Sequence, residues 1–148
     1  MITSLMPAID ARLVGLILLV SAAAAWDITA RRIPNLLLLA GALTSLVLLI
    51  QSRGWFGLTD WIAGGGLMLA LFLIPYVLGI LGAGDVKLMA TIGCFLGPIA
   101  AFWNGVMCAF SGGVLSLMVL VLLPWDRPVS RIPYGVSIAL GTLTFIAL

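Results

Sequence analysis

The sequence predicts an all-α integral membrane protein, a bundle of about six transmembrane helices with both termini outside the cytosol. Apolar residues make up 64% of the 148 residues and charged residues only 8%, whereas about a quarter of a soluble domain is charged. The mean hydropathy is +1.31. Several apolar runs approach the roughly 20 residues that cross a bilayer. We therefore treat 1–148 as a single membrane-embedded domain whose main solvent is the lipid bilayer.

Six apolar runs, separated by polar residues, are the candidate spans. They cover residues 11–30, 34–51, 61–81, 86–104, 105–123 and 132–148. The first run ends in four alanines, as a secretory signal could. However, Asp10 and Arg12 precede it instead of a basic region, so we interpret it as a retained span. The third run follows Asp60, which is a suitable helix N-cap.

The stretch 86–123 is too long for one helix, and its division is the least certain. Asn104-Gly105 is the strongest turn signal in its middle, although Pro98 could instead kink the fourth span. The tryptophans lie near predicted span ends, as interfacial anchors do: Trp26, Trp55, Trp61, Trp103 and Trp125. The grouped glycines predict close helix packing: Gly64-Gly65-Gly66, Gly112-Gly113, and Gly135 with Gly141.

The basic residues are distributed unequally between the two sides of such a bundle. One side has five of them: Arg31, Arg32, Lys87, Arg127 and Arg131. The other side has Arg12 and Arg53. The positive-inside rule places the first side in the cytosol. The basic residues are scattered, so the net charge of +2 gives no reason to expect a nucleic-acid partner.

The chain has no histidine and no glutamate. This excludes HExxH metalloproteases, Ser-His and Cys-His hydrolases, and histidine proton relays. Cys94 and Cys108 both fall in apolar runs without metal-ligand spacing, so we expect packing roles, no metal and no cofactor. Any chemistry must use aspartate, lysine, arginine or hydroxyl groups.

Two of the five aspartates are candidate catalytic residues. Asp10, Asp60 and Asp126 lie at span ends or in a loop, where a charge is unremarkable. Asp27 and Asp85 lie at the edge of the membrane, where an unpaired charge is costly and points to function. The predicted topology places both on the cytosolic face. Local pairing of Asp27 with Arg31 and of Asp85 with Lys87 is the structural alternative.

Two neighbouring carboxyl groups share a proton, because both cannot ionise cheaply. The ionised member can activate water while the protonated member polarises a peptide carbonyl. Gly82 and Gly84 precede Asp85 and permit backbone torsions that other residues cannot adopt, so a substrate strand can approach the main chain closely. Lys87 lies on the same segment and either sets topology or tunes the pKa of Asp85.

These residues form two strings that resemble a known family. Residues 82–88 read GxGDxKL, and residues 27–35 read D-x-x-x-R-R-I-P-N. Together they resemble the type IV prepilin peptidases, which are GxGD membrane aspartyl proteases. The segment Arg131-Ile132-Pro133-Tyr134-Gly135 resembles the I-P-Y-G segment of short members that serve tight-adherence (Flp-type) pili. The resemblance covers nearly the whole chain.

The resemblance implies an aspartic endopeptidase of the bacterial cytoplasmic membrane. Its substrate would be a prepilin with a basic leader and a hydrophobic helix, cleaved at the cytosolic face. Asp27 and Asp85 match the two catalytic aspartates. The CxxC-bearing N-terminal region of long members has no counterpart, so we expect neither methyl transfer nor zinc. An archaeal-type preflagellin peptidase and a non-enzymatic ion-coupled membrane protein are the alternatives.

Overall fold

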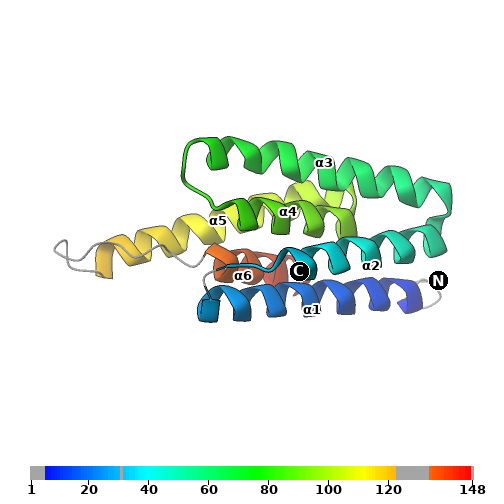
Figure 1. Ribbon diagram of the computed structural model, residues 1–148, viewed down its shortest axis with the longest axis horizontal. Coiled ribbons are helices and arrows are strands. Elements are labelled where there is room, and N and C mark those ends of the chain that lie inside the picture. Colours follow the sequence, from blue (N-terminus) through cyan, green and yellow to red (C-terminus); the bar gives the residue numbers. More distant parts are fainter. Residues whose placement is uncertain (1–5, 31, 123–133, 148) are drawn as a thin grey trace.

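The computed structural model describes residues 6–30, 32–122 and 134–147, and all of its elements are α-helices (Figure 1). The elements are α1 (Met6–Ala30), α2 (Asn35–Arg53), α3 (Trp55–Val77), α4 (Ala83–Leu96), α5 (Pro98–Leu122) and α6 (Tyr134–Ala147). Successive helices run in opposite directions along one bundle. The predicted all-α class and the helix number are therefore confirmed for the described residues.

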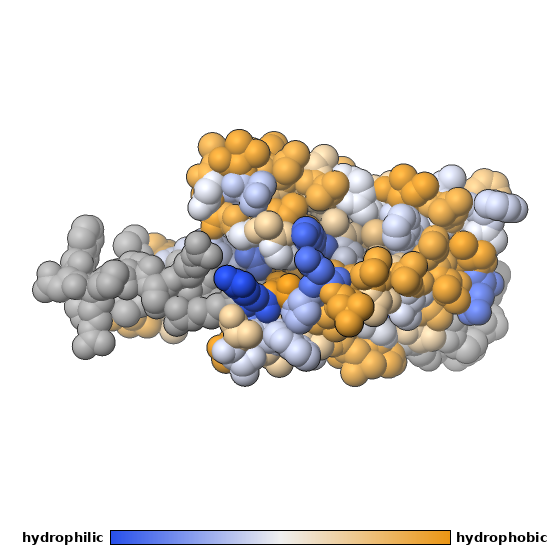
Figure 2. Space-filling view, in the orientation of Figure 1, coloured by the Kyte–Doolittle hydropathy of each residue, from blue (hydrophilic) through white to orange (hydrophobic). Residues whose placement is uncertain are grey.

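Four of the helices are long and apolar enough to cross a membrane. These spans are Ala11–Ala30, Asn35–Arg53, Trp55–Val77 and Pro98–Val119. The other two helices, α4 and α6, have 14 residues each, which corresponds to a length of about 21 Å. Large apolar side chains are exposed on the outer faces of the bundle, and Figure 2 shows them across much of the visible surface. A multi-pass membrane protein explains this surface, because lipid covers it instead of water.

The predicted division of residues 86–123 is wrong. The helix break lies at Gly97, which has a φ of +76°, and Pro98 begins α5. Glycine readily adopts the left-handed conformation that ends a helix, and proline suits the first turn of the next one. Asn104 instead lies in the middle of α5 with its side chain fully buried. Burial in the bundle has outweighed the turn preference of Asn104-Gly105.

The start of the third span also differs from the prediction. α3 begins at Trp55, directly after a tight turn at Gly54, whose φ is +61°. Asp60 therefore lies inside α3 and does not cap it. Its carboxylate instead forms an ion pair of 2.6 Å with Arg53 at the end of α2. This pair lies at the end of the bundle opposite to the N-terminus of α4 (Figure 1).

The short helix α4 lies at the centre of the bundle and packs against all five other helices. Leu88, Met89 and Ile92 of α4 are completely buried. Gly64 of α3 and Gly93 of α4 face each other, and a Cβ atom on either would overlap the backbone carbonyl of the other. The glycine run in α3 thus has the predicted packing role, except that Gly66 faces open space.

Candidate active site

Three helix ends meet at one end of the bundle. They are the C-terminus of α1 and the N-termini of α4 and α6, and each of these helices contacts the other two (Figure 1). The α1 end carries Asp27 and the α4 end carries Asp85. The sequence separates these elements widely, and the alternating helix directions bring them together.

Asp27 lies in the last turn of α1 and is half-buried. Its Oδ2 atom accepts a hydrogen bond of 2.9 Å from the backbone N–H of Gly135, the second residue of α6. The first N–H groups of a helix have no partner within the helix and favour a negative charge. A Cβ atom on Gly135 would lie 2.7 Å from the same oxygen. Asp27 is thus held by the backbone of α6 at a position that only glycine leaves free.

Asp85 is the third residue of α4 and lies outside the four membrane spans given for α1, α2, α3 and α5. It is half-buried, and its Oδ2 atom accepts a hydrogen bond of 3.2 Å from the backbone N–H of Gly82. This is the arrangement of a carboxylate that caps the start of its own helix.

The surroundings of Asp85 perturb its acidity. The pKa of Asp85 is raised to about 6: burial is the main cause, the Gly82 hydrogen bond acts in the opposite direction, and the negative charge of Asp27 makes a smaller contribution that also raises the pKa. The charge of Asp27 therefore acts on Asp85 across the junction of α1 and α4. The structure brings the two predicted aspartates into one electrostatic site.

The two glycines beside Asp85 do not have the predicted conformation. Neither Gly82 nor Gly84 has a positive φ, and Gly82 has a φ of −80°, which other residues adopt. The glycine that needs its conformational freedom is Gly79, with a φ of +75°, in the turn that follows α3. Gly82 contributes its N–H group, and a Cβ atom on Gly84 would make only ordinary contact with Ile33.

Lys87 does not pair with Asp85 in the described part of the chain. Its Nζ atom donates a hydrogen bond of 3.1 Å to Oδ1 of Asn35, at the start of α2. The alternative partner of Asp27, Arg31, lies outside the described residues, as do Arg127 and Arg131. Figure 2 shows strongly hydrophilic side chains gathered beside the connection of α1 to α2 and the start of α4. Arg32, Asn35 and Lys87 are exposed in this region.

Sequence reasoning missed two residues that position this site. Gly135 was grouped with Gly141 as a packing glycine, although its N–H group holds Asp27. The place of Gly135 in the I-P-Y-G segment was the sequence signal that could have indicated a role in the site. Asn35 ends the D-x-x-x-R-R-I-P-N string, yet no role was predicted for it. Its side chain fixes the ammonium group of Lys87.

The fold and the site together define a multi-pass helical membrane protein with a pair of carboxylates at one end of its bundle. The model of the type IV leader peptidase family matches residues 14–123. The chain therefore belongs to the type IV leader peptidase family, and this family implies a protease that acts on prepilins. Searches of the curated proteins and of the solved structures found no match.

Proposed function

We propose that this protein is an aspartyl endopeptidase that removes the basic leader of a Flp-type prepilin at the cytosolic face of the membrane. The observation that carries the proposal is the convergence of Asp27 and Asp85 from different helices into one site. The excess of basic residues predicted on this side supports a cytosolic location.

The environments of the two carboxyl groups suggest different roles. The Oδ2 atom of Asp27 accepts the backbone N–H of Gly135 at the start of α6, and this contact holds the carboxylate that we assign as the base. The raised pKa of Asp85 favours its protonated form. In the proposed reaction, Asp27 takes a proton from water, and the resulting hydroxide attacks the scissile carbonyl carbon. Asp85 donates its hydrogen to the carbonyl oxygen, which gives a gem-diol. The C–N bond then breaks as Asp27 returns its proton to the leaving amine and Asp85 takes back a proton from a hydroxyl of the gem-diol, so both carboxyl groups regain their starting states.

The test is cleavage of a prepilin with a basic leader, either in co-expressing cells or by the purified protein in detergent. Asp27→Asn and Asp85→Asn should each abolish the mature product, because asparagine cannot exchange the proton. Both substitutions keep an oxygen that can accept the N–H groups of Gly135 and Gly82. A loss of cleavage would therefore reflect chemistry and not the loss of a helix cap.

Asp60→Asn is the matched control, since Asp60 lies at the opposite end of the bundle in an ion pair with Arg53. An exposed pair of this kind contributes only about 0–1 kcal/mol to stability. We expect Asp60→Asn to cleave like the unmodified protein. Undiminished cleavage by both Asp27→Asn and Asp85→Asn would refute the aspartyl mechanism.

A further inference from the structure

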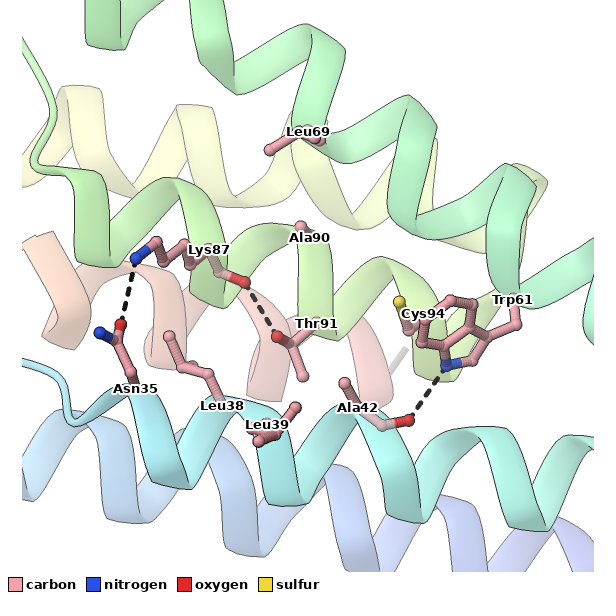
Figure 3. Close-up of a pocket in the computed structure, with 10 residues that line it drawn as sticks. All are labelled: Asn35, Leu38, Leu39, Ala42, Trp61, Leu69, Lys87, Ala90, Thr91 and Cys94. Atoms are coloured by element: carbon pink, nitrogen blue, oxygen red, sulfur yellow. Dashed lines mark hydrogen bonds between the residues drawn. The ribbon is translucent and has the colours of Figure 1, made fainter.

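A groove of about 430 Å³ lies between α2 and α3, with α4 between them (Figure 3). Four residues of α4 line it, and their spacing of three, four and seven positions puts them on one face of the helix. They are Lys87, Ala90, Thr91 and Cys94. Neither Asp27 nor Asp85 lines the groove. It is therefore a feature separate from the two carboxylates.

The middle of the groove is apolar and faces lipid. Leu39 and Leu69 line it from α2 and α3 and are 57% and 46% exposed. Both helices are candidate membrane spans, so the medium beside these side chains is the hydrocarbon of the bilayer. Trp61 lies at one end of the groove, where its indole N–H donates to the carbonyl of Ala42 at 3.1 Å (Figure 3). Because the protein already uses this donor, the apolar ring is what Trp61 offers to a ligand.

The other end of the groove carries a positive charge. Nζ of Lys87 donates a hydrogen bond of 3.1 Å to Oδ1 of Asn35 (Figure 3). Asn35 is neutral, so this bond orients the ammonium group without neutralising it. The ammonium group has two more N–H donors, and the amide of Asn35 also has two. Both residues are exposed, so this end presents several donors and a positive charge to an anion.

The charged end of the groove lies at the depth of the lipid head groups. Asn35 is the first residue of the span Asn35–Arg53, and Ala42 lies seven residues further into it, about 10 Å along the helix. The groove thus runs inward from the edge of the hydrocarbon region, as an acyl chain runs from its head group. The basic residues of the sequence predict that this edge is cytosolic, and the cytosolic leaflet contains anionic lipids.

We propose that this groove binds one anionic phospholipid of that leaflet. The phosphate accepts hydrogen bonds from Lys87 and Asn35, and the first part of an acyl chain lies along Leu39 and Leu69 toward Trp61. Such a lipid matches both ends of the groove. Its charge supplies a counter-ion for Lys87, which has no salt-bridge partner within the described residues, and its hydrocarbon covers the apolar lining.

Native mass spectrometry of the purified protein in a non-ionic detergent measures bound lipid directly. Phosphatidylglycerol and phosphatidylcholine with the same acyl chains are added in separate titrations. We expect one phosphatidylglycerol to bind about fivefold more tightly than phosphatidylcholine. A basic residue near an anionic lipid contributes about 1 kcal/mol, and about 1.4 kcal/mol corresponds to a factor of ten. Equal affinities for the two lipids would overturn the proposal.

Lys87→Gln tests the charged end, because glutamine removes the charge and keeps an N–H donor for Asn35. We expect this variant to bind the two lipids with equal affinity. Arg53→Gln is the matched control, since it removes a cation at the opposite end of α2. It should keep the fivefold preference for phosphatidylglycerol. An unchanged preference in Lys87→Gln would overturn the assignment of the head group to this end.

Two neighbouring leucines of α2 test the apolar part. Leu39 lines the groove, whereas Leu43 does not, and their exposed fractions are 57% and 55%. We expect Leu39→Trp to fill the groove and weaken phosphatidylglycerol binding, while Leu43→Trp leaves it unchanged. Equal affinities in these two variants would overturn the groove assignment.

Glycerol 3-phosphate separates a lipid site from a site for a free phosphate, because it carries the charge without acyl chains. We expect no bound glycerol 3-phosphate at the concentration at which phosphatidylglycerol saturates the protein. Binding as tight as that of the lipid would assign the site to a soluble anion and overturn the proposal. These measurements record lipid binding and not cleavage, so their outcome does not depend on the proposed function.

Discussion

Gly135→Ala is the most informative single change, because it acts on Asp27 through a distance that the structure defines. The added Cβ atom would lie 2.7 Å from Oδ2, 2.9 Å from Cβ and 3.0 Å from Cγ of Asp27. Ordinary contacts begin at 3.4 Å, so the carboxylate must retreat by about 0.7 Å, the difference between 3.4 and 2.7. Gly135 is the second residue of α6, so its N–H group follows the helix and cannot move with the displaced oxygen.

The expected loss of activity follows from two effects. Displacing a catalytic group by about 1 Å lowers the rate roughly 100-fold. The hydrogen bond from Gly135 to Asp27, now 2.9 Å long, is weakened as well, and such a bond to a charged group contributes about 1.5–3 kcal/mol. We therefore expect kcat for prepilin cleavage to fall on the order of 100-fold. The fold itself should survive, since alanine is a better helix former than glycine by about 1 kcal/mol.

The assay compares cleavage kinetics and thermal unfolding of the purified protein in detergent micelles. Gly113→Ala is the control, because a Cβ atom at this helical position meets no atom within 4 Å. It should retain the kcat and the melting temperature of the unmodified protein. If Gly135→Ala cleaves at the unmodified rate while Asp27→Asn is inactive, then the backbone of α6 does not position Asp27 during catalysis.

Two further predictions concern acidity and packing. Asp85 must be protonated to donate its hydrogen, and its pKa is about 6. We therefore expect kcat/KM to fall about tenfold per pH unit above pH 6. A flat profile of kcat/KM between pH 5 and 8 would contradict the role of Asp85 as the acid. Gly93→Ala would place a methyl group against the carbonyl of Gly64, so it should destabilise the α3–α4 contact by about 1–3 kcal/mol. Thermal unfolding measures this loss, and Gly66→Ala, which meets open space, should melt like the unmodified protein.

The sequence predicted the class of fold because the composition and the apolar runs are both properties of the sequence itself and do not depend on packing. The predicted helix boundary was wrong where two local turn signals competed. Asn104-Gly105 and Gly97-Pro98 both favour a turn, and the choice depended on which residues the bundle buries. Asn104 is fully buried within α5. Its burial depends on how α5 packs against its neighbours, and a single sequence does not reveal that packing.

The candidate site was likewise predicted in part: the side of the bundle that carries both aspartates was predictable, and the contact that holds Asp27 was not. The shared location of Asp27 and Asp85 followed from counting spans: the chain crosses two spans between them, and an even number of crossings returns it to the same side. The wrong boundaries at Gly97 and Trp55 did not change that parity. The hydrogen bond from Gly135 to Asp27 joins residues 108 positions apart. Its formation depends on how closely α1 and α6 approach, so no pattern within either helix could predict it.

A protease without histidine or glutamate must obtain its acid–base asymmetry from the surroundings of identical side chains. Here each carboxyl group is held by a backbone N–H group, from Gly135 for Asp27 and from Gly82 for Asp85. Backbone donors do not titrate, but the Gly82 bond weakens when Asp85 is protonated, which is why it acts to lower the pKa of Asp85. The two donors come from different helix starts, at 2.9 Å and 3.2 Å. The backbone contacts hold the two carboxyl groups in place, whereas the raised pKa of the proposed acid, Asp85, comes mainly from its burial.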